Sequence, residues 1–191
     1  MAPELTYSWG ACCDALMRIE HLKVLMAAEL RDADFSFDVD EEAAGPFDGP
    51  ALGGTVPVER YTKRYEMDED GVVASNPEES MLAVVRGEGR VVGYIVVSRA
   101  WNHCAQIDDV AIDRSHRRTG MARALMDEAV RWAKARGLPM LRLETQSNNV
   151  AACRFYEKYG FRLGGFDRYL YAAIPARERP EVALFWYLTV D

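Results

Sequence analysis

From residue 81 onward, short apolar runs alternate with turn signals and predict most of the strands of the chain. Residues 81–86 (MLAVVR) and 91–98 (VVGYIVVS) are rich in β-branched residues, and the turn GEGR between them predicts a β-hairpin. Gly164 and Gly165 suggest a bulge or a close backbone approach in a later strand. Further strands are expected at residues 105–112 (AQIDDVAI), 139–145 (PMLRLET), 161–171 (FRLGGFDRYLY) and 182–190 (VALFWYLTV).

Two segments between these strands carry apolar residues at helical spacing. Residues 121–136 form one pattern, which Gly137 and Pro139 end, and residues 150–159 form the other, which Gly160 closes. Strands and helices alternate in the middle of the chain while hairpins flank it, which predicts a mixed α/β sheet in a single domain over residues 1–191. The apolar faces comprise Met121, Leu125, Ala129 and Trp132 in the first helix and Ala152, Phe155, Tyr156 and Tyr159 in the second.

The N-terminal third has a weaker pattern. We expect one helix near residues 15–30, followed by irregular or edge structure, because the cluster GPFDGPALGG at 45–54 is typical of a loop. Residues 32–42 (DADFSFDVDEE) hold six carboxylates and no lysine or arginine. A solvated loop is one interpretation of this acidic run, and an acidic wall for a polyamine-like substrate is the other.

The composition of the 191-residue chain is that of a globular protein, with 49% hydrophobic and 28% charged residues. A formal net charge of −7 argues against nucleic acid as the main partner and is compatible with a cationic one. No apolar run approaches the roughly 18 residues that a membrane helix needs. Because the first residues also lack a basic segment before an apolar core, we expect a soluble cytoplasmic protein without a membrane partner.

The cysteine and histidine positions predict no metal site. The four cysteines form no C-x-x-C pair and have no histidine at zinc spacing, so buried free thiols are expected. The three histidines are too scattered for a metal site or a Ser-His-Asp triad, and each is expected to be structural or exposed. These residues are Cys12, Cys13, Cys104 and Cys153, and His21, His103 and His116.

The joint between a strand and a helix, IDDVAIDRSHRRTGMARALM, predicts an anion site. It is rich in arginine, with Arg114, Arg117, Arg118 and Arg123, and carries Gly120 before an amphipathic helix. Such a turn presents unpaired backbone N–H groups and the positive end of the helix dipole, which suit a diphosphate. The pattern fits neither the P-loop nor the G-x-G-x-x-G motif. By itself it is equally compatible with an ordinary turn.

Two signatures in this part of the chain resemble those of the GNAT superfamily of acetyl-CoA-dependent N-acetyltransferases. Residues 117–122 (RRTGMA) match Q/R-x-x-G-x-G/A, and Asn149, Tyr156, Gly160 and Phe161 match a second signature in order. The chain is most similar to the streptothricin (nourseothricin) acetyltransferases, through Trp101-Asn102, IDD, LETQSNNVAAC, FYEKYGFRLGGFD and VALFWYL, over roughly residues 80–190. It departs from them at His116-Arg117-Arg118, where they often read His-Arg-Gly, and at Asp109, which can be another residue.

The resemblance implies the GNAT fold, a mixed and mostly antiparallel central sheet flanked by helices. It implies that residues 81–191 form the acetyl-CoA-binding core, while residues 1–80 supply the predicted helix and acceptor-side loops. It also implies acetyl-CoA as co-substrate, with no metal. The cofactor-binding residues implied are Val110, Ala111 and Ile112, which would pair through their backbone with the pantetheine arm, the residues Arg117, Arg118, Thr119, Gly120, Met121, Ala122 and Arg123, and Asn149, Ala152, Phe155 and Tyr156.

Acetylation of an amine requires the free base and a proton for the leaving thiolate. An alkylammonium with a pKa near 10.4 is only about a thousandth deprotonated at pH 7.4, so a positioned carboxylate is needed. The resemblance places the general base at Glu144 and the proton donor at Tyr156. A surface salt bridge for Glu144 and simple packing for Tyr156 stay open, as does helix capping for Asn149.

Asp108 and Asp109 compete with Glu144 for the role of base. Adjacent strand residues point to opposite faces, so at most one of the two faces the substrate unless a bulge intervenes. We prefer Asp108, because it resembles the acidic residue of the relatives; the alternative is one exposed and one salt-bridged aspartate. The expected substrate-binding residues are Trp101, Asp108, Asp109, Glu144 and Asp167.

The predicted function is direct attack of a primary amine on the thioester of acetyl-CoA, without an acyl-enzyme, because no cysteine has an evident nucleophile arrangement. The expected acceptor is the β-lysyl amine of streptothricin, a small cationic molecule, so that the protein would confer resistance. Acetylation of another polyamine, a metabolite or a protein amine is an alternative, and a non-catalytic acyl-CoA-binding module is another. A homodimer is plausible from the apolar last strand.

Overall fold

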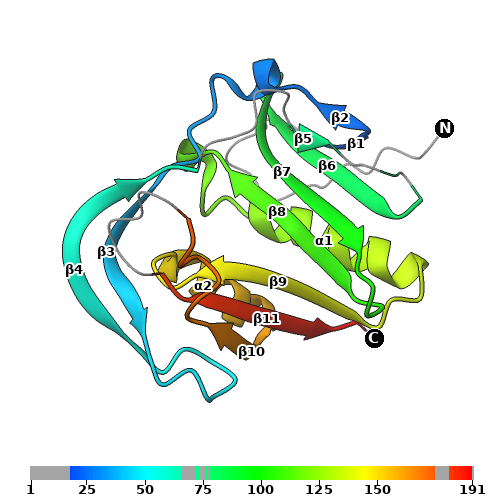
Figure 1. Cartoon of the computed structure of the whole chain (residues 1–191). Coiled ribbons are helices and arrows are strands. Elements are labelled where there is room, and N and C mark those ends of the chain that lie inside the picture. Colours follow the sequence, from blue (N-terminus) through cyan, green and yellow to red (C-terminus); the bar gives the residue numbers. More distant parts are fainter. Residues whose placement is uncertain (1–17, 66–71, 74–75, 77, 175–180, 191) are drawn as a thin grey trace.

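A computed structural model describes residues 18–65, 72–73, 76, 78–174 and 181–190. Its centre is a seven-stranded sheet in the order β1-β6-β7-β8-β9-β11-β10. Every neighbouring pair is antiparallel except β8 and β9. The predicted mixed, mostly antiparallel sheet is therefore confirmed (Figure 1). The strands are β1 (Arg18–Leu22), β6 (Ser80–Gly87), β7 (Arg90–Arg99), β8 (Ala105–Ile112), β9 (Met140–Gln146), β10 (Arg162–Asp167) and β11 (Ala183–Thr189).

The predicted hairpin forms the second and third strands of this sheet, β6 and β7. Glu88 and Gly89 join the two strands with φ of 51° and 82°. Positive φ at both central residues matches the right-handed twist of the flanking strands, as in a type I′ turn. The bulge expected at the paired glycines is also present, between Leu163 and Gly165. A Cβ on Gly164 would lie 2.4 Å from Cδ2 of Tyr187, so only glycine fits there without a shift.

Both predicted helices are confirmed, as α1 (Met121–Ala135) and α2 (Val150–Tyr159). The apolar face of α1 packs against β6 to β9, and Leu125 and Ala129 are completely buried. On α2, Tyr156 packs against Trp186 of β11 with ring centroids 6.3 Å apart. Gly137 and Gly160 follow the two helices with φ of 64° and 121°, a conformation in which glycine has no Cβ penalty.

The helix predicted near residues 15–30 is wrong where the structure describes it. Residues 18–22 form β1 and residues 24–25 form β2 (Val24–Leu25), which pairs with β5 (Val72–Val73); only the 3-10 helix η1 (Ala27–Leu30) is helical. β1 lies along the edge of β6, so pairing with a strand distant in the sequence prevails over local helix propensity. Cys12 and Cys13 lie outside the described residues.

The acidic run is not an irregular loop over its whole length. β3 (Phe37–Ala44) pairs antiparallel with β4 (Gly54–Lys63), while residues 32–36 and the segment between the two strands are irregular. Figure 1 shows β3 and β4 as a long curved pair beside α2. The backbone N–H of Ala43 donates to the carbonyl of Ser147 at 2.8 Å. This bond ties the pair to the end of β9.

The parallel strands β8 and β9 separate after three residue pairs. Their pairing ends at Ile107↔Leu143, although both strands continue beyond it. On its other edge β8 stays paired with β7, where Val97 faces Ile107 and Val96 faces Asp109, so Asp108 is the extra residue of a β-bulge. The sheet therefore opens beside residues 108–112.

Candidate active site

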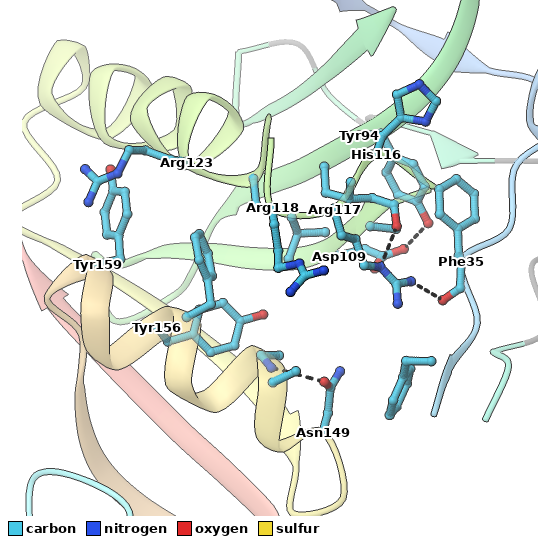
Figure 2. Close-up of a pocket in the computed structure, with 18 of the residues that line it drawn as sticks. Phe35, Tyr94, Asp109, His116, Arg117, Arg118, Arg123, Asn149, Tyr156 and Tyr159 are labelled. Atoms are coloured by element: carbon cyan, nitrogen blue, oxygen red, sulfur yellow. Dashed lines mark hydrogen bonds between the residues drawn. The ribbon is translucent and has the colours of Figure 1, made fainter. Parts of the chain in front are cut away.

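A cavity of about 1010 Å³ lies at this opening (Figure 2). Ligand sites usually have volumes of roughly 300–1,000 Å³, so the space suits a large ligand or two smaller ones. It is lined by the second half of β8, the turn before α1, one side of α2 and aromatic residues from the N-terminal third. The predicted cofactor-binding residues on its wall are Val110, Ala111, Ile112, Arg117, Arg118, Gly120, Ala122, Arg123, Asn149, Ala152, Phe155 and Tyr156.

The turn before α1 has the features of a phosphate site. Gly120, at φ 94°, directly precedes the helix, and the first N–H groups of a helix have no partner within it. Arg118 is exposed, has a left-handed φ of 64°, and its guanidinium points into the cavity (Figure 2). No hydrogen bond or ion pair joins it to another described residue. These groups fit the diphosphate of the expected co-substrate.

Three neighbouring residues of the same motif have other partners. The guanidinium of Arg117 donates to the carbonyls of Ile112 and Phe35, each at 3.1 Å. Thr119 and Met121 do not line the cavity: the hydroxyl of Thr119 donates to the carbonyl of His116 at 2.6 Å, and Met121 is buried in the core. Arg117 therefore stabilises the turn, whereas Arg118 has no hydrogen bond or ion pair with a residue that the structure describes.

The edge of β8 that faces the opening suits an extended amide chain. Pairing with β9 stops at Ile107, so this edge of residues 110–112 is not taken by β9. Val110, Ala111 and Ile112 all line the cavity. A pantetheine arm carries amide groups that can pair with such an edge as a strand does.

Asp108 and Asp109 both line the cavity, because the bulge turns consecutive residues toward the same space. The hydroxyl of Tyr94 donates to Oδ2 of Asp109 at 2.6 Å. Burial raises the pKa of Asp109 above its ordinary value, while the bond from Tyr94 lowers it. Burial also raises the pKa of Asp108, a hydrogen bond from Ser98 lowers it, and the charge of Asp109 raises it again.

Tyr156 lies across the cavity from these carboxylates. Its side chain is almost wholly buried, and its hydroxyl points into the cavity (Figure 2). Burial raises the pKa of Tyr156, and the charges of Cys153, Asp109 and Glu144 raise it further. The hydroxyl therefore keeps its proton at neutral pH and can give it to a stronger base.

Glu144 does not line the cavity. It is half-buried on β9, and the hydroxyl of Tyr171, from the segment after β10, donates to its Oε1. The position of Glu144 makes it less available to an acceptor than Asp108 and Asp109.

Trp101 and Asp167 lie away from the cavity as well. Trp101 is 91% exposed in the turn between β7 and β8, so it neither caps the core nor lines the cavity. Asp167 ends β10, where its Oδ1 accepts a hydrogen bond of 2.7 Å from the N–H of Tyr169. Both were expected on the substrate side, but neither lines the cavity: Trp101 belongs to a turn and Asp167 to the end of a strand.

Residues that the sequence did not indicate complete the wall. Phe35, Phe37 and Tyr65 come from the N-terminal third, Tyr94 from β7, and His116 from η2 (Arg114–His116). Phe35 and Phe37 lie within the acidic run, so two aromatic residues in a carboxylate-rich segment were a usable signal. His116, expected to be structural or exposed, bonds the buried Asp113 through Nδ1 at 3.1 Å and also faces the cavity.

Half of the six carboxylates in the acidic run pair with arginines. Arg114 donates to both oxygens of Asp38 at 3.1 and 2.5 Å, and Arg60 pairs with the same carboxylate at 2.5 Å. Arg64 pairs with Asp34 at 3.0 Å and Arg154 with Glu41 at 2.7 Å. Neither a simple solvated loop nor a free acidic wall describes the run, because three of its six carboxylates pair with arginines of other segments.

The described thiols do not suit nucleophilic catalysis. Cys104 and Cys153 are free and buried, and burial raises the pKa of Cys153 to about 12. A thiolate is the reactive form, so Cys153 is inert at neutral pH. Within the described ranges, no cluster of three histidine, cysteine or acidic side chains could hold a metal ion, and no helix is long and apolar enough to cross a membrane.

Known proteins resemble this chain in both sequence and structure. Residues 41–161 match the profile of the acetyltransferase (GNAT) family. Streptothricin acetyltransferase A of Bacillus subtilis strain 168 is 36% identical over 127 residues, which cover 66% of this chain and 72% of that protein. An Escherichia coli streptothricin acetyltransferase is 38% identical over 130 residues, covering 68% and 71% of the two chains.

A solved structure extends the similarity to nearly the whole chain. A Bacillus anthracis (strain Ames) protein assigned as a streptothricin acetyltransferase, crystallised with acetyl coenzyme A, superposes with a TM-score of 0.75. The match covers 91% of this chain and 99% of that one at 31% identity. The resemblance thus includes the N-terminal third, in which the sequence motifs are weakest.

Proposed function

This chain belongs to the GNAT family of acetyltransferases, and we therefore propose that its acceptor is a primary amine of streptothricin, the β-lysyl amine. It is an acetyl-CoA-dependent N-acetyltransferase. Acetylation would remove a positive charge from the antibiotic, so the protein would confer resistance. We also propose that it acts in the cytoplasm, where acetyl-CoA is available, and that it forms a homodimer.

The single observation that carries the proposal is the placement of two carboxylates and a buried tyrosine around one cavity. Asp108 and Asp109 provide negative charge for an ammonium group, and Tyr156 provides a proton on the other side. Phe35, Phe37 and Tyr65 add aromatic walls, which attract cations through their ring faces. This combination suits a cationic amine acceptor.

Acetyl-CoA supplies an activated acetyl group as a thioester. Arg118 and the N–H groups that begin α1 would hold its diphosphate, and the free edge of β8 would hold the pantetheine arm. The same contacts would place the acetyl carbonyl near the bulge, where β8 and β9 separate. Binding would thus fix the reacting carbon against the acceptor amine.

Two residues would move the protons. A carboxylate of the bulge takes one proton from the acceptor ammonium, and the free amine then forms the C–N bond as the C–S bond breaks. Tyr156 gives its proton to the departing sulfur and is restored by the second proton of the nitrogen. Overall the ammonium and the thioester become an amide, a thiol and one proton released to water.

The expected phenotype tests the acceptor. A streptothricin-sensitive bacterium that expresses this chain should grow at a higher antibiotic concentration, and expression of Tyr156→Phe at an equal level should not protect it. Acetylated streptothricin should appear in the medium of the protected culture. Growth without protection, while the purified protein acetylates another amine, would keep the enzyme class and reject streptothricin.

A further inference from the structure

Tyr94 is a buried tyrosine whose hydroxyl reaches the wall of the cavity. It is 2% exposed within β7, and its hydroxyl donates to Asp109 Oδ2 at 2.6 Å. The ring of Phe35 packs edge-on against it, with centroids 5.6 Å apart and planes at 90°. Packing therefore fixes the ring, and the ring fixes the direction of the hydroxyl (Figure 2).

The bulge at Asp108 makes this contact possible. Tyr94 pairs with Ala111 and Val96 pairs with Asp109, so Tyr94 and Asp109 are diagonal neighbours on one face of the sheet. A strand that slips by one residue turns its side chains to the opposite face. The extra residue thus decides which aspartate meets the hydroxyl.

Given the proposed reaction, we propose that Tyr94 is a positioning residue, which holds Asp109 in its ionised form on the cavity wall as the group that accepts the proton of the acceptor ammonium. A tyrosine hydroxyl donates a stronger hydrogen bond to a carboxylate than to a protonated carboxyl group. The bond therefore favours the ionised form of Asp109. This assignment favours Asp109 over Asp108 as the base.

The proton transfer is balanced without another reactant. The N–H bond of the ammonium breaks, an O–H bond forms on Asp109, and the amine keeps the electron pair. Tyr94 keeps its own proton, because burial and the charge of Asp109 raise the pKa of its hydroxyl above the ordinary value. Tyr94 therefore acts through Asp109 and not on the acceptor.

Other titratable and charged groups face Asp109. Asp108 lies next to it on β8, and the two charges repel. Tyr156 of α2 interacts with it across the cavity. Arg117 lies on the same side of the cavity, but its guanidinium is held by the carbonyls of Ile112 and Phe35. Tyr94 is the residue that donates a side-chain hydrogen bond to Asp109 among the described contacts.

The test compares wild type with Tyr94→Phe, which keeps the ring and removes the hydroxyl. The carboxyl carbon of Asp109 is titrated by NMR in protein without acceptor, and Asp109→Asn identifies its signal. The pKa of Asp109 should rise by about one unit in Tyr94→Phe, the size expected for a lost hydrogen bond to a charged group. The apparent pKa at which kcat/KM falls on the acidic side of its pH profile (the acid limb) should rise by the same amount.

A matched control removes another tyrosine–carboxylate bond. Tyr159 donates to Asp127 Oδ1 at 2.6 Å, so Tyr159→Phe should leave the titration of Asp109 in place. A purely structural role for Tyr94 would lower the melting temperature without moving that titration, and this result overturns the proposal. The proposal is also overturned if the pKa of Asp109 shifts while the acidic pKa of the kcat/KM profile stays the same. Asp109 would then not be the group that accepts the proton.

The experiments distinguish a wrong acceptor from a wrong role for Tyr94. Wild-type protein would then release no thiol with streptothricin, whatever the state of Tyr94. The Asp109 titration needs no acceptor and still decides whether Tyr94 sets its protonation, and the acid limb is then measured with the amine that does react.

Discussion

Arg114 binds Asp38 through two hydrogen bonds, of 3.1 and 2.5 Å, and so joins the turn before α1 to strand β3. Two further hydrogen bonds lie beside this pair: Arg114 N–H donates to the carbonyl of Asp34 at 2.7 Å, and Asp34 N–H donates to the side-chain oxygen Oδ2 of Asp113 at 2.9 Å. The segment that carries the aromatic wall is thus attached to the segment that would bind phosphate.

Breaking this attachment should weaken acceptor binding. Asp38→Asn removes the charge that Arg114 and Arg60 share, so Phe35 and Phe37 lose part of their support. We expect a higher KM for the acceptor and a KM for acetyl-CoA close to wild type, measured by thiol release. Asp40→Asn is the control, since its exposed carboxylate makes no ion pair with a described residue. Equal effects of the two variants would contradict this role.

Glu128 should stabilise the fold above acidic pH. It is 7% exposed on α1 and pairs with Arg131 at 2.5 Å and with His21 at 3.4 Å. Burial raises its pKa, but these partners prevail and lower it to about 2. A depressed pKa stabilises the native state above the unfolded value of 4.5, and the contribution disappears as the pH falls toward 2.

Glu128→Gln should therefore lower the free energy of unfolding by about 2 kcal/mol at pH 7, less than for a fully buried pair because Arg131 can regain water. Urea denaturation measures the loss, and the difference from wild type should shrink as the pH falls from 5 toward 2. Glu79→Gln breaks an exposed pair with Arg99 and should change stability by less than about 1 kcal/mol. A difference that grows at low pH would contradict the account.

Tyr156→Phe should lower kcat about 100-fold or more, the usual size of a lost general acid. The ring stays packed against Trp186, so the Kd for coenzyme A and the melting temperature should change little. Because the pKa of Tyr156 is raised above its ordinary value of 10, wild type should show no alkaline loss of rate from this residue below pH 10. Tyr169→Phe, an exposed tyrosine outside the cavity, serves as the control.

Arg118→Gly should separate stability from binding. A non-glycine residue at a left-handed φ costs about 1 kcal/mol, and the greater freedom of glycine in the unfolded chain costs a similar amount. The free energy of unfolding should therefore stay within about 0.5 kcal/mol of wild type. The Kd for acetyl-CoA, measured by calorimetry, should rise roughly tenfold with the lost phosphate contact. An unchanged Kd would contradict a role for Arg118 in binding acetyl-CoA.

The elements that were predicted correctly are those whose sequence pattern lies within the element itself and its flanking residues. β8 and α2 begin and end where their patterns predicted, because strand runs, caps and glycine stops act within a few residues. β1 was missed because its partner β6 lies about sixty residues later, and nothing in residues 18–22 announces that pairing. β3 was hidden by its charges, whose arginine partners come from distant segments.

In the candidate site, too, the residues within local motifs were predicted, and those that depend on strand packing were not. The turn before α1 and Tyr156 were found from motifs, and both lie on the cavity. In the sequence, Tyr94 is only one residue of an apolar run. Its hydrogen bond to Asp109 depends on the extra residue of the bulge in the neighbouring strand β8. Trp101 and Asp167 were also predicted at the site, but neither lines the cavity.

The most direct test of the central claim is thiol release from acetyl-CoA by the purified protein with streptothricin, with spermidine and lysine as comparison amines. We predict release that depends on streptothricin, a product heavier by one acetyl group on the β-lysyl amine by mass spectrometry, and loss of release in Asp109→Asn and Tyr156→Phe. Release with another amine and none with streptothricin would contradict the proposed acceptor. Full release by both variants would contradict the proposed active site.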